Sequence, residues 1–172
     1  MTLLSLLSGG ALVTAAAATL LFTFAPRDSL ETEIHIAASP SDVWAVLANG
    51  ADYPDWNPFI QSVTGEVEAG ATLTNLMVPS GGRAMTISPR VTFAEPGREL
   101  RWQGRLGLPR IMDAEHYFVL HEEGDGTRLI HGEHFHGVLM WAFSAEQFRA
   151  DFDAMNTALK ARAEAGSRSA HP

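Results

Sequence analysis

The sequence predicts an α+β domain in which a curved, seven-stranded antiparallel sheet wraps around a long C-terminal helix, preceded by one transmembrane helix. Three observations support this prediction. An uncharged apolar stretch opens the chain, strand-like runs separated by turn signals fill its middle, and an amphipathic helical pattern closes it. We expect an N-terminal anchor at residues 1–28, the folded domain at residues 29–166 and a flexible tail at residues 167–172.

The opening stretch carries no charged side chain from Thr2 to Pro26. As a helix, residues 3–25 would span roughly 34 Å, which is enough to cross a bilayer. A cleaved signal peptide and a soluble core helix are the alternatives, but no Lys or Arg precedes the run. Arg27 is the only cation near either end, which leans weakly toward a cytoplasmic domain. We therefore expect a single-pass protein of the cell membrane.

Small residues recur at four-residue spacing within this stretch, and Gly10, Thr14 and Ala18 form one such row. Rows of small residues let transmembrane helices approach one another closely. The expected partners are thus the lipid bilayer and, as an alternative, transmembrane helices of a larger complex.

The composition excludes several classes of function. The formal net charge of −8 disfavours binding to nucleic acid, because an acidic chain repels the phosphate backbone. The absence of cysteine excludes disulfides, thiolate metal sites and a cysteine nucleophile. The 46% of hydrophobic residues is enough for a packed core.

The first element of the domain is a half-buried strand. In Leu30–Ile36 apolar and polar residues alternate, so that one face of the strand meets the core. A helix then starts at Ser39, the expected cap, with Pro40 in its first turn and Asp42 near its positive end. It runs to about Ala48, where Asn-Gly follows.

Six more strand-like runs follow a proline-containing loop, and Gly- and Pro-rich turns separate them. The runs are Phe59–Glu68, Thr72–Val78, Ala84–Ala94, Glu99–Leu106, Ala114–Glu122 and Thr127–Phe135.

The last element is a long amphipathic helix. Ser144 is its expected cap, with Gln147 reaching back in a capping box. One apolar stripe follows at helical spacing, made of Phe148, Phe152, Met155 and Leu159. A curved sheet closed by this helix would leave a cavity between the two.

Five segments of the chain carry a resemblance to a known family. They are residues 37–47, 52–59, 96–102, 126–137 and 152–160. They resemble the polyketide cyclase/dehydrase-type members of the SRPBCC (START-like) proteins, and the likeness spans roughly residues 30–165. The resemblance implies a helix-grip fold around an apolar cavity and binding of an apolar or amphipathic small molecule. It implies no particular reaction.

The last strand carries the polar residues of greatest interest. Alternate residues of a strand face opposite sides, so His131 and Glu133 share one face while His134 and His136 share the other. Two ligands per face do not complete a metal site, and we expect neither a metal nor a cofactor. If the strands present Phe118 and Phe135 to the cavity, they also present His116, His131 and Glu133.

Such a polar group in an apolar cavity could hold a ligand or act as general acid and base. The alternative is that these side chains simply bond to one another across the strands. The residues that we expect to contact a ligand are Trp56, Phe59, Trp102, His116, Phe118, His131, Phe135, Phe148, Phe152 and Met155. Two apolar loops, residues 106–112 and 138–143, are expected near the cavity mouth, where they would meet a membrane or a partner, or else cover the core.

The first functional hypothesis is a membrane-anchored binding or carrier domain for a hydrophobe such as a lipid, a quinone or a pigment. The first alternative is an accessory subunit of a respiratory or photosynthetic membrane complex. The second is a cyclase- or dehydratase-type enzyme that uses His116, His131 and Glu133, which we rank last because no residue set is diagnostic.

Overall fold

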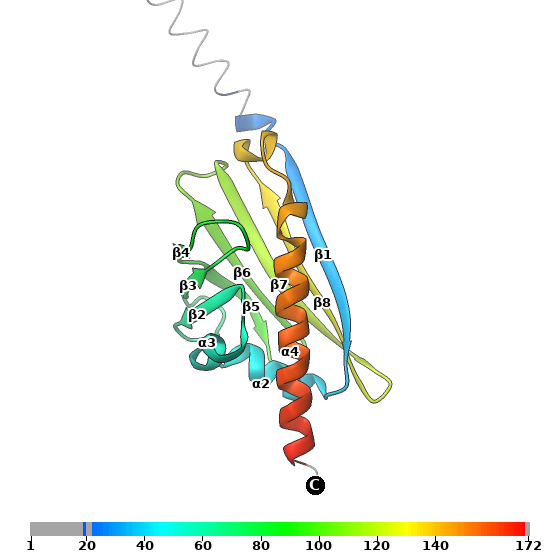
Figure 1. Ribbon diagram of the computed structural model, residues 1–172. Helices are drawn as coiled ribbons and strands as arrows, with labels where there is room; N and C mark the ends of the chain where they lie inside the picture. The colour runs from blue at the N-terminus through cyan, green and yellow to red at the C-terminus, as the bar shows by residue number, and fades with distance from the viewer. Residues whose placement is uncertain (1–18, 20–21, 171–172) are drawn as a thin grey trace, which may run out of the picture.

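A computed structural model describes residue 19 and residues 22–170, and it shows a long helix packed against a curved antiparallel sheet (Figure 1). The strands are β1 (Arg27–Ile36), β2 (Ile60–Thr64), β3 (Thr74–Met77), β4 (Met85–Ile87), β5 (Arg90–Glu95), β6 (Glu99–Leu106), β7 (Met112–Glu123) and β8 (Gly126–His136). The helices are α2 (Pro40–Ala48), α3 (Tyr53–Trp56) and α4 (Arg149–Ala170), with short 3₁₀ turns η1 (Gly50–Asp52), η2 (Val138–Trp141) and η3 (Ala145–Phe148).

The strands form two sheets where the sequence predicted one of seven strands. Five strands pair in the order β1-β8-β7-β6-β5 and three in the order β2-β3-β4, all antiparallel. The predicted run Ala84–Ala94 is split into β4 and β5 at Pro89, which has no amide hydrogen for the ladder. The Pro89 carbonyl instead accepts the amide of Leu73, and Thr72 and Arg90 form an isolated bridge between the sheets.

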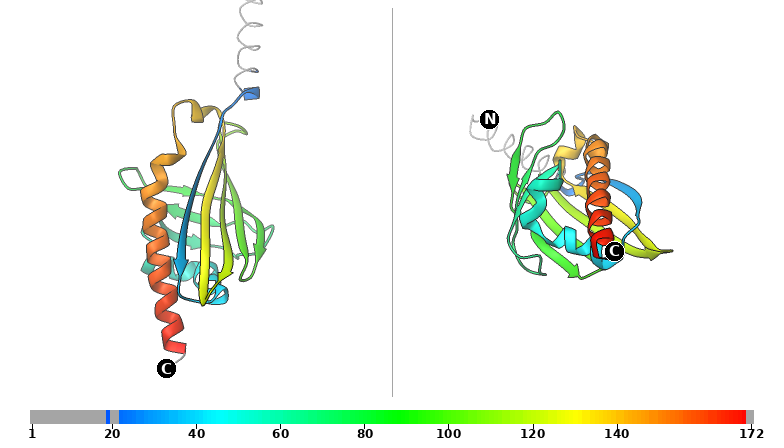
Figure 2. Two further views of the ribbon diagram at one scale, coloured as in Figure 1. Left: turned by 90° about the vertical axis from the view of Figure 1, so that its right-hand side faces the viewer. Right: turned by 60° about the horizontal axis from the view of Figure 1, so that its bottom comes forward.

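Helix α4 lies on the concave side of the curved sheets, as the views in Figure 2 show. The predicted apolar stripe faces inward, since Phe152, Met155 and Leu159 are fully buried. The helix continues past the expected domain boundary at Gly166 to Ala170, so the backbone of residues 167–170 is helical. The helical register simply continues through Gly166, where no neighbouring atom interrupts it.

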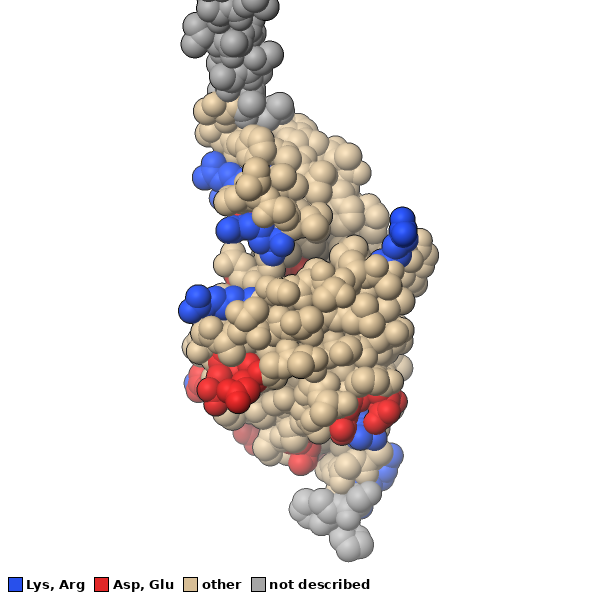
Figure 3. All heavy atoms as spheres, turned by 90° about the vertical axis from the view of Figure 1, so that its left-hand side faces the viewer, with Lys and Arg blue, Asp and Glu red and all other residues tan. Residues whose placement is uncertain are grey.

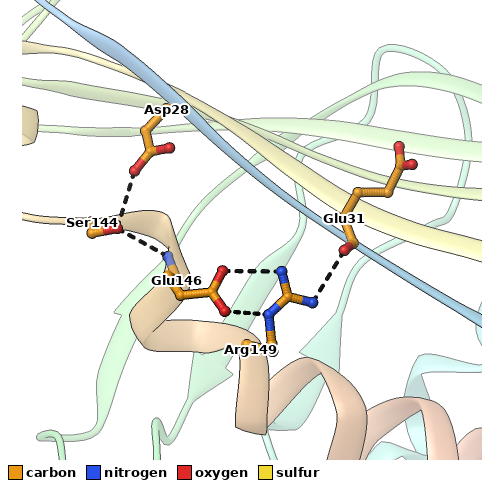
Figure 4. A network of polar contacts seen from close by, with 5 residues as sticks. All are labelled: Asp28, Glu31, Ser144, Glu146 and Arg149. Atoms are coloured by element: carbon orange, nitrogen blue, oxygen red, sulfur yellow. Dashed lines mark hydrogen bonds and ion pairs between the residues drawn. The ribbon is translucent and has the colours of Figure 1, made fainter.

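The start of the α4 region is capped differently from the prediction. Ser144 accepts the amide of Glu146, but the amide of Ala145 donates to the carboxylate of Asp28 at 2.8 Å. The first turn is η3, and the predicted capping box with Gln147 does not form. Asp28 on β1 instead provides the acceptor for a second amide of this turn, that of Ala145. Arg149 then pairs with Glu146 and donates to the backbone carbonyl of Glu31 (Figure 4). These bonds fix the beginning of α4 to the first strand.

The predicted cap of α2 is confirmed, because the Ser39 hydroxyl accepts the amide of Asp42 at 3.2 Å and Pro40 opens the helix. The folded domain begins at Arg27 with β1, two residues before the expected boundary.

The predicted transmembrane segment at residues 1–28, with its row of Gly10, Thr14 and Ala18, lies mostly outside the described residues. Among those that are described, no helix is both long and apolar enough to cross a bilayer.

Candidate functional site

A small cavity opens at the end of the sheet that lies farther from α2. Its volume is about 140 Å³, and its lining comes from β3, β4, the facing ends of β6, β7 and β8, and the segment before α4. The lining residues are Met77, Met85, Ile87, Gly104, Arg105, Leu106, Met112, Ala114, Glu133, Phe135, Phe143 and Phe148. Figure 3 shows a hollow on this side of the molecule with basic side chains around it. The lining is apolar except for Arg105, which is paired with Asp113, and Glu133.

Glu133 is the outer end of a chain of buried polar side chains. The Oε2 atom of Glu133 lies 3.5 Å from Nδ1 of His116, and Nε2 of His116 lies 2.8 Å from Nε2 of His131. Behind them, Nδ1 of His131 lies 2.7 Å from Oδ1 of Asn156, whose amide nitrogen donates to the hydroxyl of Thr32 at 2.8 Å. The chain thus joins β8, β7, α4 and β1 through the centre of the fold.

Aromatic rings enclose the two imidazoles. The His131 ring is stacked on Phe152, with centroids 4.0 Å apart, and on Phe118, with centroids 4.5 Å apart. The ring of His116 is stacked on Trp102 at 4.9 Å. Because these faces exclude water, the imidazoles cannot be solvated as cations.

Burial shifts all three titratable groups toward their neutral forms. Loss of solvation lowers the pKa of His116 to about 3 and holds the pKa of His131 well below its usual range. The same loss of solvation raises the pKa of Glu133 to about 8. At neutral pH this chain of polar side chains therefore contains two neutral imidazoles and a carboxylic acid. Its members can donate and accept hydrogen bonds, but the chain carries no net charge.

The structure brings only part of the predicted site to the cavity. Of the predicted ligand contacts, Phe135 and Phe148 line it, and so does Glu133, which was predicted as a weak catalytic candidate. The others pack in the core away from this cavity; they are Trp56, Phe59, Trp102, His116, Phe118, His131, Phe152 and Met155. Both ring nitrogens of His131 bond to protein partners, so neither nitrogen is free to bond to a ligand.

The prediction for the two faces of β8 is confirmed, because His131 and Glu133 are buried while His134 is exposed. The apolar loops also lie where we expected, since Leu106, Met112 and Phe143 line the cavity.

Thr32 and Asn156 were missed in the sequence, although signals for both existed. Thr32 has the same parity as Leu30 and Ile36 on β1, and Asn156 comes four residues after Phe152 on the buried stripe of α4. A polar residue at an inward position of an amphipathic element is a sign of a buried hydrogen bond.

The family model for polyketide cyclase / dehydrase and lipid transport matches residues 27–164, from the start of β1 almost to the end of α4. The chain belongs to this family. No curated protein is similar enough in sequence to match.

Solved structures of this family's fold superimpose on most of the chain. Norcoclaurine synthase from Thalictrum flavum, in complex with dopamine and hydroxybenzaldehyde, has a TM-score of 0.63 at 16% identity, covering 83% of this chain and 89% of that one. The ginseng major latex-like protein 151 from Panax ginseng has a TM-score of 0.65 at 11% identity over 78% and 96% of the two chains.

The di-domain ARO/CYC StfQ from the steffimycin biosynthetic pathway has a TM-score of 0.61 at 14% identity over 83% of this chain, which spans only 51% of StfQ. At these identities the likeness shows the fold alone. The expected helix-grip architecture of antiparallel sheet and long C-terminal helix is confirmed.

Proposed function

We propose that this family member binds a small apolar ligand in the cavity beside Glu133. The observation that carries the proposal is a space of about 140 Å³ with an almost wholly apolar lining, which lies at one end of the hydrophobic core. An engineered apolar cavity of roughly 150 Å³ stays dry and binds benzene. The space therefore fits about one ring, or the end of a longer lipid, quinone or pigment whose remainder stays outside.

The enzyme alternative has less support. Of the three candidate catalytic residues, only Glu133 lines the cavity. His116 is covered by Trp102, and His131 is bonded on both sides within the protein. A general acid or base must reach the reacting atom, so Glu133 alone could take that role.

We also propose that the domain works at a membrane surface to which its N-terminal segment holds it. The support is an exposed apolar surface at the end of the domain where that segment enters, which we term the apex. It comprises Phe24, Leu106, Leu108, Leu139 and Trp141. Leu108 is 69% exposed and Trp141 is 65% exposed. An exposed aromatic and aliphatic cluster of this kind suits a membrane interface.

Hydrogen bonds to backbone carbonyls hold the segments of the apex together. Arg110, in the turn between β6 and β7, donates to the carbonyl of Phe22, and its own carbonyl accepts the amide of Val138. The amide of Gly137 donates to the carbonyl of Pro26 at 3.1 Å. The chain that leaves the described residues therefore starts from the same surface that exposes the apolar side chains.

Ligand binding is tested by an NMR titration of the full chain, in a mild detergent, with p-xylene as the probe. We expect saturable binding that Ala114→Phe abolishes, because Ala114 lines the cavity and a phenyl ring would fill it. The matched control Ala161→Phe places the same ring on the exposed face of α4 and should bind like the wild type. Equal binding by wild type and Ala114→Phe would refute the proposal.

Membrane attachment is tested by fractionation. We expect the full chain in the membrane fraction after an alkaline carbonate wash, and a variant lacking residues 2–22 in the supernatant. A full chain that stays in the supernatant would refute it. Extraction with mild detergent separates the carrier from the accessory-subunit hypothesis, because an accessory subunit would be recovered in a stoichiometric complex with other membrane proteins.

A further inference from the structure

The buried polar chain has a direction that its own atoms determine. The hydroxyl of Thr32 donates to the backbone carbonyl of His131 at 3.0 Å, an oxygen that can only accept. The hydroxyl oxygen is thereby free to accept from the amide nitrogen of Asn156. This orientation turns the amide oxygen of Asn156 toward Nδ1 of His131, which must therefore carry the hydrogen.

The same reasoning extends outward to the cavity. A neutral imidazole has one N–H, so His131 Nε2 is an acceptor and the facing Nε2 of His116 is a donor. His116 then has only a lone pair at Nδ1, and the atom 3.5 Å away is Oε2 of Glu133. A lone pair facing a carboxyl oxygen requires a proton between them, which places the carboxylic hydrogen of Glu133 on Oε2.

This arrangement leaves one carboxyl oxygen for a ligand. Within residues 22–170, Oε1 of Glu133 has no hydrogen-bond partner, and the side chain lines the cavity while remaining about 10% exposed. An oxygen without a hydrogen is an acceptor only. The other charged group of the lining, Arg105, already pairs with Asp113 at 2.5 Å.

We propose that Oε1 of Glu133 accepts a hydrogen bond from the ligand, so that the cavity selects an apolar molecule of about one ring that carries a hydroxyl group. This inference rests on the proposed function, because it assumes that the cavity takes a ligand. It adds the ligand's polarity: a hydrogen-bond donor at one end, and a hydrocarbon body against Phe135, Phe148 and the methionines of β3 and β4.

The preference follows from what each ligand leaves unpaired. A hydroxyl that enters the cavity loses its bonds to water and regains one at Oε1, whereas a ligand without a donor leaves Oε1 without a partner. A ligand that can only accept would place its oxygen against Oε1, with repulsion between two lone pairs. We expect a net preference of about five- to tenfold for the donor.

The experiment compares p-cresol, p-xylene and p-methylanisole by NMR titration of the full chain at neutral pH. The three probes share one ring and differ in offering a donor, no polar group or an acceptor only. Glu133→Gln and Glu133→Met are the informative variants. Gln can donate to His116 through its amide nitrogen and accept through its oxygen, so it should keep the p-cresol/p-xylene affinity ratio within about twofold. Met has a similar shape without an acceptor oxygen and should lower the ratio about five- to tenfold.

The outcomes are distinguishable. If no probe binds, both the proposed function and this inference fail. If p-xylene binds as well as p-cresol once water-to-octanol transfer is taken into account, or if p-methylanisole is preferred, the cavity binds ligands but the assigned polarity is wrong. If Glu133→Met does not fold, the titrations of the wild type and of Glu133→Gln decide. A preference for a donor requires that each of these two proteins bind p-cresol more tightly than both other probes.

Discussion

Replacing Glu133 by Gln should remove the contribution of this carboxyl group to the pH dependence of stability between pH 6.5 and pH 8. Burial raises the pKa of Glu133 from 4.5 to about 8 in the folded state. The unfolded chain releases this proton near pH 4.5, so between these values the folded state binds one proton more. The contribution to the free energy of unfolding is complete below pH 4.5, falls as the pH rises and is lost near pH 8.

The magnitude follows from one proton. Within this window the contribution of Glu133 to the free energy of unfolding falls by about 1.4 kcal/mol per pH unit, or by about 2 kcal/mol in all between pH 6.5 and pH 8. The lower limit is chosen because the imidazoles act in the other direction. The pKa of His116 is lowered to about 3 and that of His131 is lowered as well, so below pH 6.5 the unfolded state binds more protons and stability falls with decreasing pH. The wild type should be most stable near pH 6.5.

Urea unfolding of the full chain in a mild detergent, followed by tryptophan fluorescence at intervals of half a pH unit, measures this slope. Trp102 reports on the site directly, because its ring is stacked on His116. Glu133→Gln cannot titrate and should show a difference from the wild type that shrinks steadily toward higher pH. Glu122→Gln, an exposed change on β7, should keep the wild-type slope. Parallel slopes for wild type and Glu133→Gln would refute the assignment of a neutral, buried carboxyl group.

Two further changes test the packing around the polar chain. Asn156→Leu should lower the free energy of unfolding by about 2 kcal/mol in a urea titration, because it leaves the buried N–H of His131 without an acceptor; an unchanged midpoint would show that this bond is not formed. Gly132→Ala should lower the free energy of unfolding by about 1–3 kcal/mol, since the added methyl group would lie 2.3 Å from the ring of Tyr117. In Gly166→Ala the added methyl group meets no atom, and the higher helix propensity of alanine should raise the melting temperature. Equal effects of the two glycine changes would contradict this packing.

The sequence predicted the elements better than their junctions. Alternation along β1 and β8 and the stripe on α4 depend on burial of one face, which the sequence records directly. The division of the run Ala84–Ala94 into two strands at Pro89 could have been predicted from the sequence, because proline interrupts the hydrogen bonding between strands. That Leu73 then pairs with the Pro89 carbonyl and connects the two sheets depends on long-range geometry, which local periodicity does not contain.

The same distinction explains what was predicted of the site. The side on which His131 and Glu133 lie follows from parity, and the structure confirms it. Which of them reaches a cavity does not follow, because it depends on where β4 of one sheet packs against β6 of the other. Met77 and Met85 contribute to the lining from strands whose sequence gives only ordinary half-buried patterns. The cavity therefore lies at one end of the interior, away from Trp102 and Phe118, the predicted aromatic wall, which pack within the core.

The position of the cavity connects its two proposed properties. Leu106 lines the cavity and is also 50% exposed at the apex, so the cavity adjoins the apolar surface of the apex. A hydrophobe in a bilayer would enter there without crossing water, and it would reach Glu133 only after its apolar body had replaced solvent at the mouth. Burial raises the pKa of the Glu133 carboxyl group and so keeps it neutral, and aromatic rings stacked on His116 and His131 contribute to that burial. The proposed binding selectivity and the proposed attachment to a membrane thus depend on the same end of the domain, where the buried polar chain reaches the cavity.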